Sequence, residues 1–155
     1  MKVILASDSH MRNETLDYIE QRHPDASFYL HCGDLEDDPL EFPNWIFVRG
    51  NNDYFGEFVK QRILDIEGHR IFMLHGDRIP YMVLPERLVE LGKKYGADIV
   101  CFGHTHRSYI EKKHGVLLIN PGSLCYPRDG KPPCYAILEI TKNDVSCEIV
   151  YEPEW

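Results

Sequence analysis

The chain has 155 residues, of which 43% are apolar and 27% are charged, and its formal net charge at pH 7 is −8. This length and apolar content predict a single globular domain over residues 1–155 and exclude an intrinsically disordered chain. The acidic balance argues against stable nucleic-acid binding, which needs a basic face. No apolar run approaches the ~18–20 residues that cross a bilayer, and the N-terminus lacks signal-peptide features, so we expect a soluble cytoplasmic protein.

The first half of the chain predicts three short strands, each followed by a polar loop. Short apolar runs, typical of buried strands, cover Lys2–Ala6, Ser27–His31 and Trp45–Val48. Between the first two, Asn13 is predicted to cap a helix that continues to about Arg22. The apolar side of that helix would carry Leu16 and Ile19, with Tyr18 as a further candidate.

The second half predicts a hairpin, a helix and a further set of strands. Gly68 separates the hairpin strands Arg62–Glu67 and Arg70–Leu74. Apolar residues at 84, 88, 91 and 95 have the spacing of an amphipathic helix over Leu84–Tyr95, which Gly96 ends. Later strands, mostly antiparallel, are predicted at Asp98–Phe102, Tyr109–Lys112, Val116–Asn120, Tyr135–Ile140 and Val145–Tyr151. Many strands and few helices predict an α/β fold of two packed sheets flanked by helices.

The cysteines do not predict a disulfide framework or a structural zinc site. Their number is odd and they contain no CxxC pair. We expect buried, reduced thiols at positions 32, 101, 125, 134 and 147.

Five polar clusters stand where predicted strands end, the position at which open α/β sheets hold their ligands. Their side chains are carboxylates, imidazoles and a carboxamide, a set that suits divalent Mn, Fe, Co, Ni or Zn. In an extended segment Asp8 and His10 would point the same way and so hold one ion, unless the loop bends sharply. The clusters are Asp8-Ser9-His10, Gly33-Asp34, Gly50-Asn51-Asn52-Asp53, His75-Gly76-Asp77 and Gly103-His104-Thr105-His106.

The order of these clusters, closed by Asn120-Pro121-Gly122-Ser123, resembles that of the calcineurin-like metallophosphoesterases. The resemblance runs from Asp8 to about Arg128 and is greatest with the small bacterial and archaeal phosphodiesterase branch. It implies a four-layer αββα sandwich of two mixed sheets flanked by helices, with a binuclear metal site at the sheet edges. Each motif is weak alone, and the ordered set carries the resemblance.

Carried over position by position, the resemblance implies two divalent ions. Mn²⁺ is the first candidate, and Ni²⁺, Co²⁺, Fe²⁺ and Zn²⁺ are alternatives. The implied activity is hydrolysis of a small phosphate ester, a diester before a monoester, by in-line attack of a metal-bridging hydroxide. The implied ligands are Asp8, His10 and His106 for the first ion, Asn51, His75 and His104 for the second, and Asp34 as the bridge.

The sequence departs from the family pattern at Asn52, where many members carry a histidine that can protonate the leaving group. Asn52 cannot act as a general acid at neutral pH. It would bind a phosphate oxygen together with Asn51, or serve only as a turn residue. Arg128 is a second candidate for phosphate binding or a plain surface residue.

Other polar residues near the clusters have two interpretations each. Asp53 would orient a ligand histidine or occupy a turn, and Asp77 would orient a ligand or be solvated. We expect His31 to be a buried structural residue. Surface positions are expected for the remaining histidines, His23, His69 and His114.

A non-catalytic, metal-binding scaffold on the same fold is the alternative function. The retromer scaffold subunit resembles this branch and also lacks the general-acid histidine. Its ligand set is partly substituted, whereas the set here is complete, which favours the enzyme. Three aromatic residues expected to be exposed would line the pocket or form a homo-oligomer face: Phe55, Phe58 and Tyr81.

Overall fold

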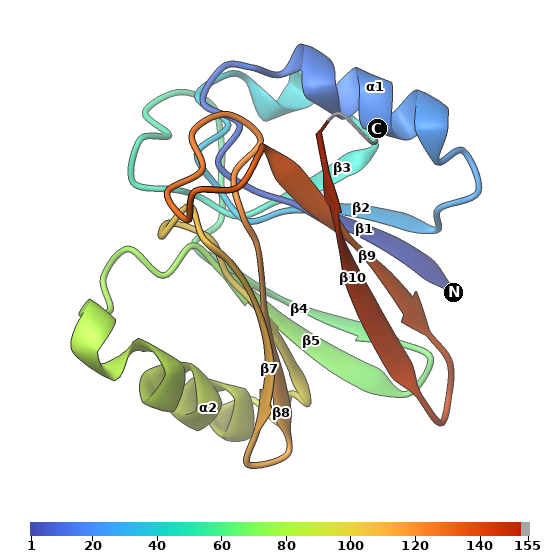
Figure 1. Cartoon of the computed structure of the whole chain (residues 1–155), viewed down its shortest axis with the longest axis vertical. Helices are drawn as coiled ribbons and strands as arrows, with labels where there is room; N and C mark the ends of the chain where they lie inside the picture. The colour runs from blue at the N-terminus through green and yellow to red at the C-terminus, as the bar shows by residue number, and fades with distance from the viewer. Residues whose placement is uncertain (153–155) are drawn as a thin grey trace.

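The computed structural model describes residues 1–152 and contains two five-stranded sheets that pack face to face (Figure 1). The first, in the spatial order β10-β9-β1-β2-β3, is built from β1 (Lys2–Ala6), β2 (Phe28–His31), β3 (Trp45–Phe47), β9 (Cys134–Ile140) and β10 (Val145–Tyr151). The second, in the order β4-β5-β6-β8-β7, is built from β4 (Gln61–Ile66), β5 (His69–Leu74), β6 (Ile99–Cys101), β7 (Ser108–Lys113) and β8 (Val116–Pro121).

Both sheets are mixed, as the sequence predicts. β1, β2 and β3 run parallel, while β9 is antiparallel to β1 and β10 is antiparallel to β9. In the second sheet β5, β6 and β8 are parallel, and β4 and β7 are antiparallel edge strands. The predicted hairpin around Gly68 is the β4–β5 pair.

A helix covers the outer face of each sheet, which gives the expected four-layer αββα order (Figure 1). Strand β1 shows why its sequence is continuously apolar. Val3 and Leu5 point into the core between the sheets, whereas Ile4 and Ala6 pack on the opposite side with α1. Both faces of the strand are therefore dry, and an alternating polar pattern would bury unsatisfied side chains.

Helix α1 (Glu14–Arg22) buries Leu16 and Ile19 as predicted, but its N-terminus differs from the expectation. Asn13 has helical backbone angles and makes no side-chain capping bond. Its amide instead donates to the Leu35 carbonyl oxygen at 3.2 Å, which ties the helix to the loop after β2. Tyr18 is 42% exposed and does not belong to the apolar side.

Helix α2 (Leu84–Lys94) directly follows a short 3₁₀ turn at Tyr81–Val83. Another 3₁₀ turn, Pro39–Glu41, lies earlier in the chain, before β3. Leu84 and Leu88 are buried, and Tyr95 stacks on Phe72 with ring centroids 4.7 Å apart. Gly92 is also buried, and a larger residue at this position would press on two valines of the sheet. The three-to-four spacing located the buried face of the helix but not this close contact.

All five cysteines are free thiols. Three are buried as expected, whereas Cys125 and Cys147 are only half-buried. Within residues 1–152 no helix has both the length and the apolar character to span a bilayer.

The histidines outside the polar clusters divide into three environments. His31 is fully buried and contacts Ser9 Oγ at 3.0 Å, as expected for a structural residue, and burial lowers its pKa to about 3. His114 is exposed, also as expected. The surface expectation is wrong for His23, whose ring is buried with Nε2 2.7 Å from Tyr135 Oη.

His69 also differs from the expected surface residue, because it connects the two sheets. Its Nδ1 lies 2.5 Å from Asp98 Oδ2, and its Nε2 lies 2.8 Å from the Thr141 carbonyl oxygen in the β9–β10 turn. Both partners are acceptors, so only the imidazolium donates to both. The hydrogen bond to Asp98 is the main cause of the raised pKa of His69.

This contact predicts a pH-dependent contribution to stability. Because the folded-state pKa lies above the unfolded value of about 6.5, the contribution is fully present below about pH 6.5 and is lost as pH rises through the folded pKa. His69→Gln should lower the free energy of unfolding near pH 6 by only about 1 kcal/mol, because Asp98 is partly solvated. The loss should be smaller near pH 9, because the contribution of the wild-type contact falls as the pH rises. Urea unfolding of both proteins at the two pH values measures this, and an equal deficit at both would contradict the imidazolium assignment.

Candidate metal centre

The carboxyl ends of the parallel strands from both sheets lie at one edge, where their loops are joined by backbone hydrogen bonds. The loop after β1 is tied to the loop after β2, because the Asp8 N–H donates to the Gly33 carbonyl oxygen at 2.9 Å. In the second sheet, the Gly103 N–H donates to the His75 carbonyl oxygen at 3.1 Å. Ser123 Oγ, after β8, donates to the Asp8 carbonyl oxygen at 2.8 Å and so connects the two sheets.

One half of the centre contains two carboxylates and two imidazoles. Ligand atoms of Asp8, His10, Asp34 and His106 all lie within 4.8 Å of one another. The Nε2 atoms of His10 and His106 are 3.0 Å apart. Asp8 Oδ1 is 3.6 Å from His10 Nε2 and 3.2 Å from His106 Nε2.

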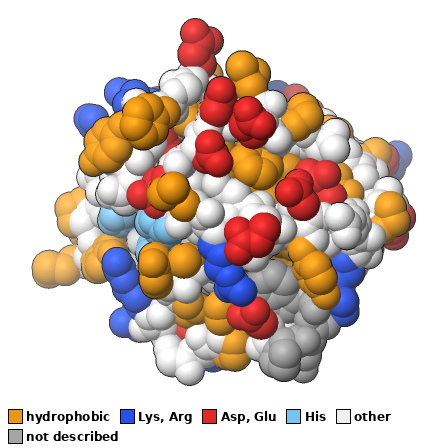
Figure 2. All heavy atoms as spheres, turned by 90° about the horizontal axis from the view of Figure 1, so that it is seen from above, with side chains coloured by type: hydrophobic (Ala, Val, Ile, Leu, Met, Phe, Trp, Pro, Cys, Tyr) orange, Lys and Arg blue, Asp and Glu red, His pale blue; other side chains and the backbone are white. Residues whose placement is uncertain are grey.

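The other half contains Asn51, His75 and His104. Asn51 Oδ1 lies 2.9 Å from His75 Nε2 and 3.1 Å from His104 Nδ1. Asp34 lies between the halves, with Oδ2 3.4 Å from His75 Nε2 and 3.7 Å from His10 Nε2. The structure therefore brings all seven predicted ligand residues together, in the two groups that the resemblance implies. On the face shown in Figure 2, histidine side chains reach the surface together at one place.

Three of the histidines are oriented by acceptors on the far side of the ring. Nδ1 of His75 and of His106 donates to the carbonyl oxygens of Cys32 and Tyr126, each at 2.7 Å. A carbonyl only accepts, so these rings carry their proton on Nδ1 and, when neutral, direct an Nε2 lone pair to the centre. His10 Nδ1 lies 2.7 Å from Glu36 Oε2.

These orienting groups were not predicted from the sequence. Two of them are backbone carbonyls, which every residue has, so no residue type marks them. Glu36 could have been found as an acidic residue two positions after Asp34.

The donor set fits a divalent cation. Asp8 Oδ1 is fully buried and has no hydrogen-bond partner within the described residues. Leaving such an oxygen unpaired is costly, and a cation bound there would compensate it. The crowded Nε2 atoms of His10 and His106 likewise face each other as two lone pairs unless a proton or cation lies between them.

The ionisation of the side chains in the centre also fits a bound cation. Burial alone would lower the pKa of His75, but its hydrogen bond to Asp34 and the charges of Asp8 and Asp34 raise it to about 9. Burial opposes ionisation of Asp8, yet the imidazoles of His10, His75 and His106 beside it keep the pKa of Asp8 below its ordinary value. The carboxylates thus attract positive charge, which a bound cation would supply in place of protons.

The backbone of the centre is strained. Five of its seven residues have a positive φ, a conformation that is uncommon outside glycine and that concentrates at functional sites. Of the two alternatives that the sequence left open for Asp8 and His10, the loop therefore adopts the sharp bend and not the extended segment. The five are Asp8 (54°), His10 (44°), Asp34 (62°), His104 (69°) and His106 (58°).

Asn52 and Asp53 hold the bridging residue in place. The Asn52 backbone N–H donates to Asp34 Oδ1 at 2.9 Å, and its side-chain amide donates to Asp34 Oδ2 at 3.1 Å. Asp53 is buried and accepts from the backbone N–H groups of Asp34, Glu36 and Gly50. These bonds favour the turn interpretation of Asp53, which contacts no ligand histidine in the hydrogen bonds of residues 1–152.

The remaining candidates lie around the centre. The Arg128 backbone N–H donates to the His106 carbonyl oxygen at 2.8 Å, so its loop runs beside a ligand residue, and its side chain is exposed. Asp77 is exposed, and Phe55 and Tyr81 are 72% and 59% exposed. Phe58 differs from the expectation, because it is half-buried and packs edge-on against Phe47 with centroids 6.0 Å apart.

Comparison with known proteins agrees with this fold. Residues 1–143 match the family model described as the calcineurin-like phosphoesterase superfamily domain. A probable metallophosphoesterase of Bacillus subtilis is 34% identical over 155 residues, covering 98% of this chain and 91% of that protein. A predicted phosphoesterase of Streptococcus pneumoniae superposes with a TM-score of 0.89 at 23% identity, covering 97% and 88% of the two chains.

A second similar structure is that of an archaeal phosphodiesterase, with a TM-score of 0.74 and 25% identity over 97% of this chain and 100% of that one. The fold and the site thus define a protein of the phosphoesterase class whose Asp and His side chains could hold a metal ion. The chain belongs to the calcineurin-like phosphoesterase superfamily.

Proposed function

We propose that the protein is a binuclear-metal-dependent phosphodiesterase acting on a small phosphate ester. One observation carries the proposal: Asp34 Oδ2 lies between two groups of nitrogen and oxygen donors, 3.7 Å from His10 Nε2 and 3.4 Å from His75 Nε2. Asp8, His10 and His106 would hold one ion, and Asn51, His75 and His104 the other, with Asp34 shared. Nitrogen and oxygen ligands suit Mn²⁺, the first candidate, as well as Ni²⁺, Co²⁺, Fe²⁺ and Zn²⁺.

Two ions bound in this way would supply an activated water nucleophile and neutralise charge that develops on the phosphoryl oxygens. The residues of the chain do the positioning. Glu36, Cys32 and Tyr126 fix the histidine rings, and Asn52 fixes the Asp34 carboxylate through two hydrogen bonds. Such orientation lowers the entropy that is lost when the reacting groups come together.

The leaving group has no histidine donor at the Asn52 position, which favours substrates whose leaving groups need no proton. The Asn52 amide already donates to Asp34, so its first role in the proposed mechanism is to position the bridge. A diester with a phenolic leaving group meets this requirement. The similarity to an archaeal phosphodiesterase supports the choice of a diester over a monoester.

Metal loading should switch the activity on. Purified protein stripped with EDTA is expected to be inactive, and addition of Mn²⁺ should restore hydrolysis of bis-p-nitrophenyl phosphate at a higher kcat/KM than that of p-nitrophenyl phosphate. Both reactions are followed by release of p-nitrophenolate. Absence of turnover with each of Mn²⁺, Co²⁺, Ni²⁺, Fe²⁺ and Zn²⁺ would contradict the enzyme and favour the scaffold.

Metal stoichiometry is the accompanying measurement. Anomalous scattering from a crystal grown with Mn²⁺ should show two peaks, one on each side of Asp34. A single peak would contradict the binuclear assignment while leaving the metal dependence intact.

A further inference from the structure

A cleft lies directly beside the metal centre and is lined by basic side chains. We call it the basic cleft, and its volume is about 480 Å³. Its charged lining residues are Arg49, Lys60, Asp77 and Arg78. It is therefore large enough for a phosphoryl group together with part of the molecule that carries it.

The charge of the basic cleft is opposite to that of the whole chain. The net charge of the protein is −8, yet three cations and one carboxylate line this space. Among residues 1–152, Arg49, Lys60 and Arg78 have no carboxylate within ion-pair distance. Several other basic residues are neutralised by such pairs, as Arg70 is by Asp65.

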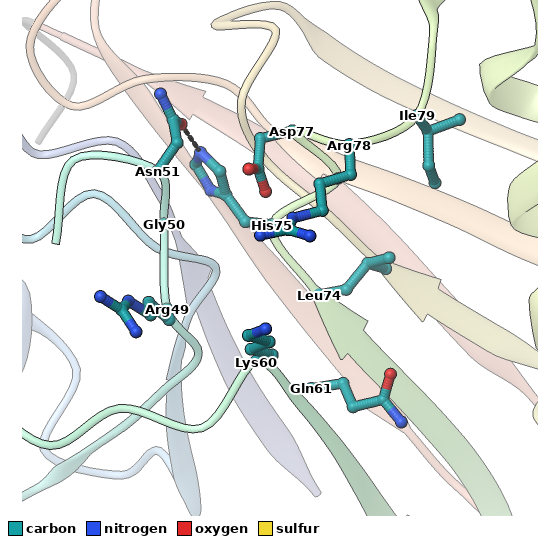
Figure 3. A pocket seen from close by; sticks show the side chains of 11 residues that line it. Arg49, Gly50, Asn51, Lys60, Gln61, Leu74, His75, Asp77, Arg78 and Ile79 are labelled. Atoms are coloured by element: carbon teal, nitrogen blue, oxygen red, sulfur yellow. Dashed lines mark hydrogen bonds between the residues drawn. The ribbon is translucent and has the colours of Figure 1, made fainter.

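The basic cleft and the metal centre share two residues. Asn51 and His75 line the cleft and also belong to the second half of the centre, with Asn51 Oδ1 2.9 Å from His75 Nε2. Figure 3 shows this pair at one end of the cleft, with the charged ends of Lys60 and Arg78 toward its middle. A ligand that extends from the centre along the cleft would therefore place one of its groups between Lys60 and Arg78.

The lining selects for charge. The cleft carries no Phe, Tyr or Trp on which a base would stack, and its apolar side chains are Leu74 and Ile79. Arg49 is held at one wall, because its Nε donates to the Asp53 carbonyl oxygen at 3.2 Å, while the ends of Lys60 and Arg78 are exposed. Guanidinium and ammonium groups together match a phosphate dianion.

We propose that the basic cleft binds a second phosphoryl group of the substrate, one that is not hydrolysed. The substrate class is then a small phosphodiester that carries an additional phosphate, such as a bisphosphorylated nucleoside or sugar ester. Lys60 and Arg78 are the specificity-determining residues. This inference rests on the proposed function, since it assigns the second phosphate to a substrate of the same centre.

Two matched esters test the inference. The p-nitrophenyl ester of thymidine 5′-phosphate and the same ester with an added 3′-phosphate have identical reacting groups and differ only in the second phosphate. Wild-type protein loaded with Mn²⁺ should have a KM about tenfold lower for the bisphosphorylated ester. Lys60→Gln and Arg78→Gln should each raise that KM about fivefold and the double variant should abolish the preference, with kcat unchanged.

A matched control separates the cleft from net charge. Lys112→Gln removes the same charge from the exposed face of β7, at the opposite edge of the sheet from β4, and should leave both KM values at the wild-type level. For all variants the KM of the ester without the 3′-phosphate should stay within about twofold of wild type, since long-range effects are screened by salt. Equal changes for both esters, or an unchanged preference in the double variant, would overturn the inference.

Calorimetry separates this inference from the proposed function. Thymidine 3′,5′-bisphosphate should bind metal-loaded protein about tenfold more tightly than thymidine 5′-phosphate, and the double variant should bind both equally. If neither ester is hydrolysed, the phosphodiesterase proposal fails. The difference in affinity between the two nucleotides then tests by itself whether the basic cleft binds a second phosphate. Equal affinity of the wild-type protein for the two nucleotides would refute the cleft assignment even where turnover is observed.

Discussion

Replacing Asp34 with asparagine is expected to lower kcat/KM by at least about a thousandfold, because the proposed bridge between two ions loses its charge. The Asp34 carboxylate accepts two hydrogen bonds from Asn52, one at each oxygen. An amide at position 34 would place an NH₂ group against one of these donors. Two donors would then face each other in a buried site, which adds to the loss of charge.

The fold should survive this change, since the two side chains have nearly the same shape. Mn²⁺ titration followed by calorimetry should show weaker binding or a lower stoichiometry, and circular dichroism should remain that of the wild type. Asp17→Asn makes the same chemical change on the exposed side of α1 and should leave kcat/KM unaltered. Near-wild-type activity of Asp34→Asn would remove the bridging role from this residue.

The second large effect is expected from Gly50→Ala, which adds a single methyl group behind the metal centre. A Cβ at Gly50 would lie 2.1 Å from Asp34 Oδ1 and 2.2 Å from the Asp34 backbone nitrogen. Real Cβ atoms do not approach other atoms so closely, so the loop or the carboxylate must move. We expect at least about a hundredfold loss of kcat/KM, because a displacement of about 1 Å is costly at a catalytic centre.

Gly92→Ala is the matched control, because Gly92 also lacks a positive φ and is also buried. There the new Cβ would meet the ends of Val100 and Val116 at 3.0 and 3.1 Å, in a helix far from the centre. It should change thermal stability modestly and leave the activity per folded molecule intact. Thermal unfolding and steady-state kinetics on both variants separate the effects, and a Gly50→Ala protein with normal kinetics would show that the loop adapts freely.

The same close approach explains why small residues follow the strands at this edge. Gly33 has a φ of +106°, and a Cβ there would lie 2.6 Å from His75 Nδ1. A glycine therefore serves two purposes in the loop after β2: it adopts a left-handed backbone and leaves room for the His75 ring from the other sheet. The dipeptide Gly33-Asp34 is an ordinary turn in the sequence and becomes specific only through this packing.

Local patterns determined much of the architecture. Short apolar runs located the strands at Lys2–Ala6 and Trp45–Phe47, because a strand that is dry on both faces needs apolar side chains throughout. The three-to-four spacing located α2 because one face of a helix must be buried. Polar residues at strand ends predicted a ligand site there, since the carboxyl ends of parallel strands meet at one edge. The family resemblance then assigned the candidate ligands.

Predictions that depended on a single residue type were less reliable. Asn13 is a residue type that often caps helices, but its side chain donates to the Leu35 carbonyl oxygen. His23 and His69 stand in sequence contexts typical of the surface. His23 is nevertheless buried against Tyr135, and His69 joins the two sheets. A polar side chain takes the partner that folding brings near it, and that partner is distant in the sequence.

The sequence by itself determined the order of elements and a fold of two packed sheets, because these follow from periodicity. The seven ligand candidates came from the family resemblance that the ordered motifs carry. Only the tertiary structure decided how Asp34 lies between two donor groups and which carbonyls orient the histidines. It also decided that Lys60 and Arg78 share one cleft with His75. Such relations join loops from both sheets, and their physical basis is packing and hydrogen bonding between residues that no local pattern connects.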